Sequence, residues 1–469
     1  MGRLRAAGAA RPRVAPTRLL CVCAAVALLS CGRPGERRAS GPEAAAEPPL
    51  VIAHVSLVDV ALGSLVPDQT VVVRSGRIAQ AGDAALSAVP QGATVVDGRG
   101  RYLMPGLWDS HVHALFDAEV ARSFLPRFVA EGVTGVRDMG GKVEVLRAAR
   151  FAILAGTLIG PRIVAAGAVV DGPHPADPAV SIAVGDSGAA RAAVDSLARS
   201  GADFIKVYTL LPRQSYFAVL REAARLGLPV AGHVPAGVTP LDAAVGGQRS
   251  IEHLRDEAEP LCAAVSDPAC VRLLDTLRVH GTWLVPTLVV LRVKAILDDS
   301  SLVRDSRLGA VPDLVRAAWE GIREREGPRP AAYWREKRAR FFGELALTGA
   351  AWRQGVPLLA GTDAGALYTY PGSSLHEELA QLVRAGLTPA AALRAATLGA
   401  AEFLGAADSM GTVAVGKVAD LVLLGADPLA DIRNTRRIEG VVLRGRLLAR
   451  PVLDSLAAVG GAVRRPSGS

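Results

Sequence analysis

Short apolar runs separated by polar turns organise the chain from about residue 50 onward. Residues 50–103 contain several such runs, including Leu50-Val51-Ile52-Ala53, and the same texture returns in Val418–Leu424 and Ile438–Leu443. Runs of this length, rich in valine, leucine and isoleucine and bounded by Gly and Asp, predict β-strands. We therefore expect one small β domain, a β-sandwich built from residues 50–103 and 412–457.

The middle of the chain, residues 104–411, alternates strand-like with helix-like segments, as successive βα units do. Candidate strands lie near residues 103–113, 132–138, 161–170, 202–209, 229–234, 250–254, 282–288 and 357–363. Eight such units predict an α/β protein with a (β/α)8 TIM barrel. The last interval is longer than a barrel unit of about 31 residues. We interpret the charged stretch near 291–353 as an insertion beside the site, with the character of a lid.

Six polar residues interrupt this apolar pattern. His111 and His113 are two positions apart in a predicted strand, so both rings face the same side and can reach one metal ion. Lys206 stands inside an apolar strand, where an unpaired charge costs several kcal/mol, roughly, so we expect it to be neutralised, paired or modified. The other three each end a short apolar run: His233, His253 and Asp363. This set predicts a metal site at the C-terminal strand ends, where barrel enzymes keep their chemistry.

The first 31 residues have the features of a processing signal. Five arginines precede an apolar run, Leu19 to Leu29, that is too short for a stable membrane-spanning helix, and the segment has no acidic residue. Leu28-Leu29-Ser30-Cys31 resembles a bacterial lipobox, which predicts lipidation of Cys31, and residues 32–49 read as a flexible tether. We therefore expect an exported protein anchored by lipid to the bacterial cell envelope. An ordinary secretory signal and an uncleaved anchor are the alternatives.

Composition narrows the classes of partner. Half of the residues are hydrophobic and 21% are charged, as in globular proteins. The formal charge of +8 falls to +3 without the five leader arginines, because 48 basic residues then face 45 acidic ones. No basic stripe with interleaved aromatics is present in the sequence, so nucleic acid is not expected as a partner. Beyond the leader only Cys262 and Cys270 remain, and they form either a disulfide or two buried thiols.

The ordered series His-x-His, Lys, His, His, Asp resembles the amidohydrolase superfamily. The likeness includes Met104-Pro105-Gly106-Leu107-Trp108-Asp109-Ser110-His111-Val112-His113 and the closing Gly416-Lys417-Val418-Ala419-Asp420-Leu421-Val422. Gly132–Gly141 and His376-Glu377-Glu378-Leu379, followed by Ala385–Pro389, look most like the imidazolonepropionase-related group. That group includes dipeptidases that act on Xaa-Pro or on basic and apolar C-terminal residues.

The resemblance implies a role for each of the six residues. His111, His113 and Asp363 would bind the more buried of two divalent ions, for which zinc is the expected metal. His233 and His253 would bind the second ion. Lys206, carboxylated by carbon dioxide, would bridge both ions as a carbamate, which explains a lysine in an apolar strand.

The predicted activity is that of a binuclear metal-dependent hydrolase of C–N amide bonds. A metal-bridging hydroxide would attack the substrate carbonyl, and Asp363, the only carboxylate of the set, would act as general base. A dipeptide or another small N-acyl amino acid is the expected substrate. The alternatives are a single-metal hydrolase of cyclic amides, of the imidazolone type, and a non-catalytic surface-binding lipoprotein. A homo-oligomer is compatible with the sequence.

Three further residues are candidates for substrate binding. Tyr208 shares the strand face of Lys206 and would contact substrate or an oxyanion; the alternative is a packed tyrosine. Arg137, at the end of the second strand, could bind a substrate carboxylate. His376 either faces the substrate or caps the helix that follows. Asp109, on the face of His111, is a supporting or turn residue.

Overall fold

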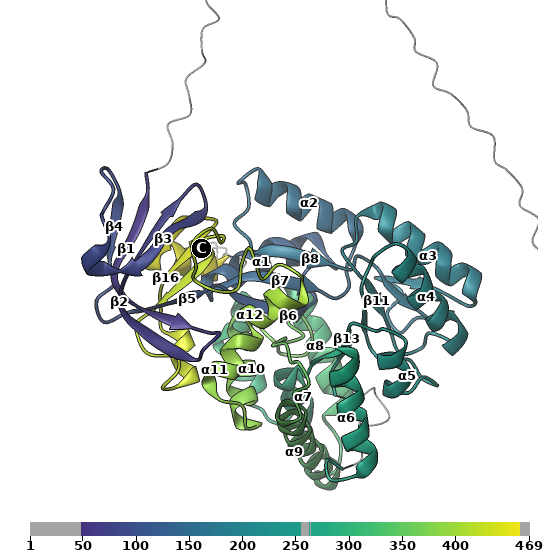
Figure 1. Cartoon of the computed structure of the whole chain (residues 1–469). Helices are drawn as coiled ribbons and strands as arrows, with labels where there is room; N and C mark the ends of the chain where they lie inside the picture. The colour runs from purple at the N-terminus through teal and green to yellow at the C-terminus, as the bar shows by residue number, and fades with distance from the viewer. Residues whose placement is uncertain (1–47, 255–261, 263, 460–469) are drawn as a thin grey trace, which may run out of the picture. The chain divides into compact units, whose positions relative to one another are not determined.

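The computed structural model describes residues 48–254, 262 and 264–459. The predicted leader with Cys31 lies outside these residues, as does most of the tether. Within the described part of the chain, no helix is long and apolar enough to cross a membrane. Figure 1 shows the ribbon of the whole chain.

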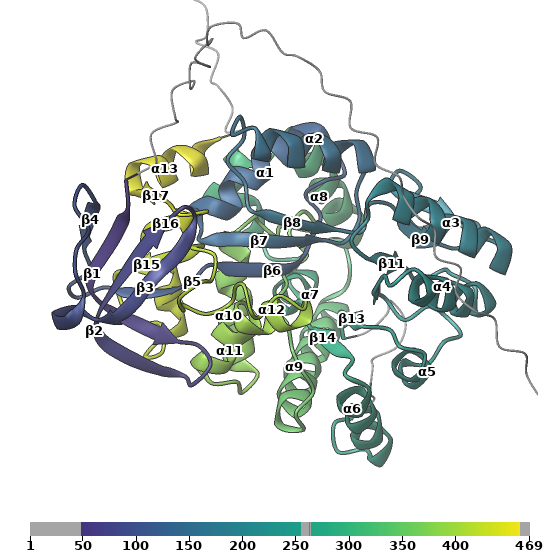
Figure 2. The ribbon, with the colours of Figure 1, turned by 45° about the horizontal axis from the view of Figure 1, so that its top comes forward.

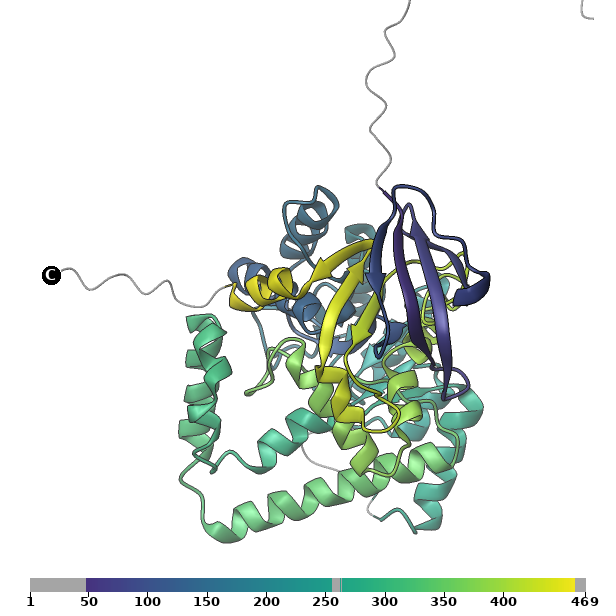
Figure 3. The same cartoon turned by 90° about the vertical axis from the view of Figure 1, so that its left-hand side faces the viewer.

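The two strand-rich ends of the described chain form one eight-stranded sheet. The N-terminal strands are β1 (Leu50–Asp59), β2 (Ser64–Arg74), β3 (Arg77–Asp83), β4 (Thr94–Asp97) and β5 (Tyr102–Pro105). The C-terminal strands are β15 (Leu421–Leu424), β16 (Ile438–Leu443) and β17 (Arg446–Ala449). The order is β17-β16-β15-β5-β1-β2-β3, with β4 on β1, and the purple and yellow strands lie side by side in Figure 3. Because β5 pairs with β15 in this continuous ladder, the predicted β-sandwich is not confirmed.

The middle of the chain holds two parallel sheets. The first joins β6 (Leu107–Val112), β7 (Val133–Asp138) and β8 (Arg162–Ala165), which run side by side in Figure 2. The second has the order β10-β9-β11-β12-β13-β14. Its strands are β9 (Val169–Asp171), β10 (Ser181–Ala183), β11 (Ile205–Val207), β12 (Val230–Gly232), β13 (Ser250–Glu252) and β14 (Trp283–Val285).

Residues 357–363 connect the two parallel sheets. Leu284 N donates to Pro357 O at 3.0 Å, and Ser110 N donates to Ala360 O at 2.9 Å, so this segment lies between β14 and β6. Between β8 and the second sheet the described residues form no regular ladder, although Asp203 N donates to Ala165 O. The fold is therefore α/β with parallel sheets, as predicted, while closure of an eight-stranded barrel is not detected.

Helices follow most of the parallel strands. They are α1 (Ala118–Ala130), α2 (Val143–Leu154), α3 (Ser187–Ser200), α4 (Arg213–Arg225), α5 (Pro240–Val245), α6 (Pro268–His280), α10 (Ser373–Arg384), α11 (Pro389–Ala395), α12 (Leu398–Phe403) and α13 (Arg450–Ala458). Short 3-10 turns are η1 (Ala84–Leu86) and η4 (Ile432–Arg436). The sequence sets the ends of α3 clearly: Asp186 accepts from two backbone amides of the first turn, and Gly201 closes the helix in the left-handed conformation.

The stretch between β14 and residues 357–363 is helical. It contains α7 (Leu288–Ala295), η2 (Leu302–Arg304), η3 (Ser306–Ala310), α8 (Asp313–Glu326) and α9 (Ala331–Arg353), the long green helix along the bottom of Figure 3. We call residues 288–353 the outer wall. Trp319, Trp334 and Phe341 bury their rings in the main core, which attaches the outer wall to the parallel sheets. Its action as a lid stays a prediction.

Cys262 and Cys270 are joined by a disulfide, with their Cα atoms 5.3 Å apart. Cys270 lies in the first turn of α6. Of the two alternatives that the sequence left open, the structure has the bridge.

Candidate active site

The six predicted residues lie at or near the carboxyl ends of the parallel strands. His111 is the second-last residue of β6, and Lys206 is the central residue of β11. His233 and His253 directly follow β12 and β13, and Asp363 ends the segment between β14 and β6. Parallel strands end on the same side of a sheet, so residues far apart in the sequence meet there.

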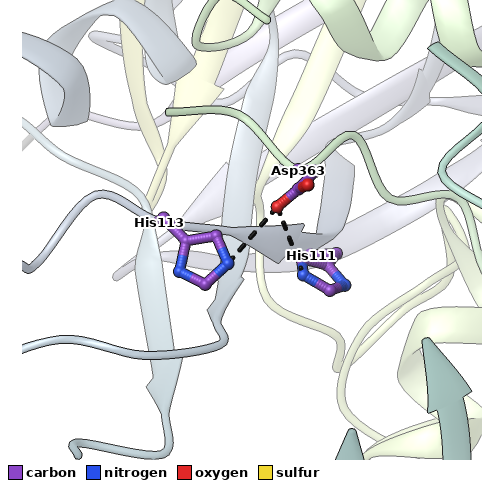
Figure 4. A group of neighbouring side chains, drawn as sticks. All are labelled: His111, His113 and Asp363. Carbon is purple, nitrogen blue, oxygen red and sulfur yellow. Dashed lines mark ion pairs between the residues drawn. The ribbon is translucent and has the colours of Figure 1, made fainter. Parts of the chain in front are cut away.

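The side chains of this set converge. Asp363 Oδ1 lies 3.4 Å from His111 Nε2 and 3.3 Å from His113 Nε2, and Figure 4 shows the carboxylate between the two rings. Ligand atoms of these three residues all lie within 4.8 Å of one another, as metal binding requires. The ring centroids of His111 and His253 are 4.8 Å apart, and those of His253 and His233 are 4.9 Å apart. The four histidines therefore form one connected cluster.

The protein occupies the Nδ1 atom of each ring. His111 Nδ1 donates to Glu252 Oε2 at 2.8 Å, and His113 Nδ1 lies 3.3 Å from the carbonyl oxygen of Gly140. The other two rings bond to hydroxyls: His233 Nδ1 to Thr209 Oγ1 at 2.9 Å and His253 Nδ1 to Thr287 Oγ1 at 2.6 Å. Contacts of this kind fix the ring orientation and tautomer, as they do for metal-bound histidines.

The charge states of three of the rings and of the carboxylate also fit metal binding. Burial lowers the pKa of His111 to about 4, and it holds the pKa values of His233 and His253 well below the usual value, so these rings are neutral at pH 7. Burial would raise the pKa of Asp363, but the neighbouring His113, His111 and His253 hold it well below its usual range. Neutral imidazoles and an ionised carboxylate are the forms that bind divalent metals.

A network of buried polar groups holds Glu252, the partner of His111 Nδ1, in place. The second oxygen of Glu252, Oε1, accepts from Arg137 Nη2 at 2.7 Å, and Arg137 Nη1 donates to Ser250 Oγ at 2.9 Å. Arg137 Nε donates to the carbonyl of Ser110 at 2.6 Å, and only 2% of the arginine is exposed. We call Ser110, Arg137, Ser250 and Glu252, together with Asp109 and Thr362, the buried floor.

This placement corrects the interpretation of Arg137 as a substrate ligand. The guanidinium is buried and already bonded to Ser110, Ser250 and Glu252, so it positions Glu252 and through it His111. Burial would raise the pKa of Glu252, but the charge of Arg137 and the hydrogen bond from His111 hold it well below its usual range. The carboxylate is therefore ionised and keeps the Nδ1 proton on His111.

Asp109 supports the other side of the floor. Its Oδ2 accepts from the hydroxyl of Thr362 at 2.6 Å, and its Oδ1 accepts from Thr362 N at 3.0 Å and from His111 N at 3.3 Å. These bonds link β6 to the segment that carries Asp363. Burial raises the pKa of Asp109 to about 7.

Two of the candidate ligands have left-handed backbone conformations. His253 has a φ of 66° and Asp363 a φ of 64°. Non-glycine residues rarely adopt this region, and such strain is concentrated at functional sites. Hydrogen bonds hold both residues in place: His253 N donates to Val285 O at 2.9 Å, and Asp363 N donates to His111 O at 2.8 Å.

Lys206 is fully buried in β11, beside β12 and therefore close to His233. Its charge contributes to the lowered pKa values of His111 and His233, so it acts on the same cluster. Its Nζ atom lies 5.6 Å from the ring centroid of Tyr208. Tyr208 stacks on His233, with ring centroids 4.1 Å apart, and lines the cavity described below.

His376 does not reach this cluster. It lies in the first turn of α10 with 1% exposed, its Nδ1 bonded to Thr435 Oγ1 at 2.9 Å and its Nε2 to the carbonyl oxygen of Glu131 at 3.1 Å. Neither predicted alternative, substrate contact or helix capping, describes this residue. It joins α10 to the end of α1 and to η4 inside the protein.

A cavity of about 470 Å³ opens over the cluster. Its inner end is formed by His113, His233, His253, Asp363 and Tyr208. Most of the rest is formed by side chains of the outer wall. The volume is suited to a small molecule rather than a polymer.

The donor set fits one or two divalent metal ions. His111 Nε2 is buried and makes no hydrogen bond within the described residues. It lies 3.4 Å from Asp363 Oδ1 and carries no proton, because the proton of this neutral ring is on Nδ1. Two imidazoles and a carboxylate are typical zinc ligands. His233, His253 and Lys206 adjoin this group and could serve a second ion.

A sequence profile described as "Amidohydrolase family" matches residues 102–448, most of the described chain. This chain belongs to the amidohydrolase family. This match confirms the resemblance to the amidohydrolase superfamily and identifies the protein as an enzyme, an amidohydrolase.

Several proteins resemble this amidohydrolase over most of its length. An uncharacterized protein of Mycobacterium tuberculosis is 28% identical over 406 residues, 81% of this chain and 93% of its own. Bottromycin amidohydrolase is 30% identical, with a TM-score of 0.69, covering 87% of this chain and 88% of that one. A Bifidobacterium longum structure, provisionally described as a prolidase, is 25% identical with a TM-score of 0.69, covering 89% and 100%.

Other matches are partial. An adenine deaminase of Mesorhizobium japonicum is 34% identical over 87 residues, which is 19% of this chain and 14% of that protein. The imidazolonepropionase of Caulobacter vibrioides is 37% identical over 89 residues, 19% of this chain and 22% of its own. The chain thus matches only a minor part of these curated relatives.

Sequence reasoning missed the residues that support the ligands. Glu252 was visible as a carboxylate inside an apolar strand, directly before His253, and a buried carboxylate requires a partner. That rule could have drawn attention to it, although it could not name Arg137. Thr209 and Thr287 carry no comparable signal, because isolated threonines are common in such loops.

Proposed function

We propose that this amidohydrolase cleaves the amide bond of a small substrate, a dipeptide or another N-acyl amino acid, with two divalent ions, zinc the expected metal. The observation that carries the proposal is the shared arrangement of the four imidazoles, each of which the protein holds through its Nδ1 atom beside Asp363 or the next ring of the cluster. A cavity of small-molecule size over this cluster supports it.

In the proposed site, His111, His113 and Asp363 would hold one ion, and His233 and His253 would hold the other. Lys206 would be a ligand shared by both, as a carbamate formed when its neutral Nζ attacks the carbon of CO2 and loses a proton. Divalent ions bound here would polarise the substrate carbonyl and lower the pKa of water. The full burial of Lys206 supports this assignment, because a carbamate replaces a buried ammonium with an anionic ligand.

The chain's own groups handle the proton. Asp363 is ionised and faces the cavity, so its carboxylate can take a proton from the attacking water and deliver it to the leaving amine. Tyr208, which lines the cavity beside His233, is placed to contact the substrate. The buried floor keeps His111 fixed while this proton moves.

A screen with metal analysis tests the proposal. The protein without residues 1–31 is assayed on a library of dipeptides and N-acyl amino acids with added zinc and bicarbonate, and its metal content is measured. We expect turnover and close to two ions per chain. We expect Lys206→Ala to lose metal and activity; full metal content and rate in this variant would contradict the bridging role.

The same experiment separates the other candidates. A single-metal hydrolase of cyclic amides would bind one ion and open imidazolone-type rings, a reaction suggested by the partial match to imidazolonepropionase. A surface-binding lipoprotein would turn over nothing. The buried Lys206 beside His233 favours the two-metal enzyme over both.

We also propose that the enzyme is exported and anchored through a lipidated Cys31. The disulfide between Cys262 and Cys270 supports export, because such bonds persist in oxidising compartments. Release of Cys31→Ser from the membrane fraction would support the anchor, and unchanged retention would contradict it.

A further inference from the structure

The outer wall gives the cavity two kinds of lining. One kind is a group of apolar side chains: Leu291, Ala295, Leu297, Ile322, Trp334 and Leu367, the last from beyond the outer wall. Three cations also line it, Lys294 on α7 and Lys337 and Arg340 on α9. A cavity with an apolar lining and one suitably placed charge is a specific site for a small amphiphilic molecule.

The three cations differ in how they are paired. Arg340 is paired with Glu336, one turn away on the same helix. Lys337 holds its ammonium 5.2 Å from the ring centroid of Tyr333. Lys294 has no hydrogen bond or ion pair to any residue in the described ranges. Of the three, it is the cation for which the described residues provide neither an ion pair nor an aromatic ring.

Lys294 lines the same cavity as His233, His253 and Asp363. The helix that carries it, α7, begins directly after Thr287, whose hydroxyl lies 2.6 Å from His253 Nδ1. The start of this helix is therefore attached to the candidate ligands, and Lys294 opens on the cavity that they share.

The acidic residues of the lining are already engaged. Glu326 Oε2 accepts from the hydroxyl of Tyr333 at 3.0 Å, and Arg329 lies 3.9 Å from its other oxygen. Glu344 is buried and takes part in an interaction of its own. Neither carboxylate forms an ion pair with the ammonium of Lys294, which remains available to an anion that enters the cavity.

We propose that Lys294 binds the free carboxylate of the substrate and restricts the enzyme to dipeptides and N-acyl amino acids with an apolar C-terminal residue. This inference rests on the proposed amide hydrolysis. In such substrates one carbon atom separates the carboxylate from the scissile nitrogen, so an amide held at Asp363 brings its carboxylate into the cavity that Lys294 also lines. The apolar lining of the outer wall receives the C-terminal side chain.

The test compares Ala-Leu with its C-terminal amide, which keeps the scissile bond and the apolar side chain but lacks the charge. Release of alanine gives kcat/KM for each. We expect the wild type to prefer the acid. We expect Lys294→Met to reduce the ratio of the two kcat/KM values by about tenfold or more, mainly through KM, since a charge-assisted hydrogen bond is lost. Lys294→Arg should keep most of the preference.

Arg292→Met is the matched control, because Arg292 lies on the same helix but does not line the cavity. We expect it to leave the preference unchanged, and metal content checks that each variant keeps its site. An unchanged ratio in Lys294→Met, or an equal loss on both substrates, would overturn the proposal. So would a wild type that does not distinguish acid from amide.

Calorimetric binding of N-acetyl-leucine and N-acetyl-leucinamide separates this inference from the proposed function. Absence of turnover would count against amide hydrolysis. Tighter binding of the acid that depends on Lys294 would still support the carboxylate site, whereas equal binding of the two compounds, or no binding, would overturn it.

Discussion

The buried floor holds His111 and the segment of Asp363, the outer wall lines the cavity over the candidate ligands, and the two are built in opposite ways. In the floor, Arg137 and Glu252 are almost inaccessible to solvent and bonded to each other and to Ser250. In the wall, ion pairs such as Arg338 with Asp298 are partly exposed. Buried charges depend strongly on their partners, whereas exposed pairs contribute little.

The difference indicates a division of tasks. The floor fixes His111 and the segment of Asp363 through several mutually dependent bonds, which suits residues that must hold metal and move a proton. The wall presents apolar and charged side chains that can be substituted one at a time without disturbing the floor. We therefore expect the chemistry to depend on the floor and the substrate preference on the wall.

The largest expected effect follows from Asp363→Asn, which changes the ligand that the floor positions. The amide keeps the size and one oxygen but cannot take up the proton of the attacking water. General-base catalysis contributes about 10²–10⁴ in rate, so we expect a loss of kcat of at least that order. Steady-state kinetics on protein of measured metal content would check it. Activity within a few-fold of wild type would identify another group as the base.

Glu252→Gln tests the floor without replacing a candidate metal ligand. The substitution leaves the buried guanidinium of Arg137 without its counter-charge, which costs about 3–5 kcal/mol of stability. It also weakens the partner of His111 Nδ1, so metal affinity should fall about 10–100-fold. Denaturant unfolding and metal titration measure the two effects.

Asp298→Asn is the matched control in the wall, since it removes the charge opposite Arg338 at a partly exposed pair. We expect it to cost less than about 1 kcal/mol. Equal costs for the two substitutions would mean that the floor and the wall do not differ as described.

The sequence could predict the ligands better than their surroundings. His111 and His113 follow from the two-residue period of a strand, and His233, His253 and Asp363 follow from strand ends, which are local features. The partners of Arg137 lie 113 and 115 residues away, and those of His376 lie 59 and 245 residues away. No local pattern shows that such residues are already bonded, so the sequence leaves substrate binding open as a role for both.

The same limit applies to the fold and to the outer wall. Alternating apolar residues predict strands at 50–103 and near 421–449, but that alternation is the same in a sandwich and in the single sheet that β5 and β15 complete. Lys294 lies in a stretch rich in basic residues, so only the cavity distinguishes it from its neighbours. Pairing across the chain, rather than local preference, decides both features.

The last prediction concerns stability alone and the side chain of Glu378, which attaches the wall to the interior. Its Oε2 accepts from Val289 N at 2.7 Å in the first turn of α7, while Oε1 is buried without a hydrogen bond within the described residues. Burial raises the pKa of Glu378 to about 8, so the folded protein holds the neutral acid at pH 7.

This raised pKa predicts how stability depends on pH. The contribution of Glu378 is fully present below about pH 4.5, the ordinary value for the unfolded chain, and is lost as the pH rises through about 8. Glu378→Gln keeps a neutral side chain and should remove this slope. We expect it to gain about 4 kcal/mol on the wild type between pH 5 and pH 9, because the difference accumulates at about 1.4 kcal/mol per pH unit up to the folded pKa.

Denaturant unfolding of both proteins across that pH range, at fixed zinc concentration, measures the difference. Asp109 and Asp138, whose pKa values burial raises to about 7 and about 6, impose similar slopes on both proteins and cancel in the comparison. Parallel stability curves would show that Glu378 is already ionised in the folded protein. The start of α7 would then be held by a charged carboxylate, and the outer wall would share the charged support that otherwise distinguishes the buried floor.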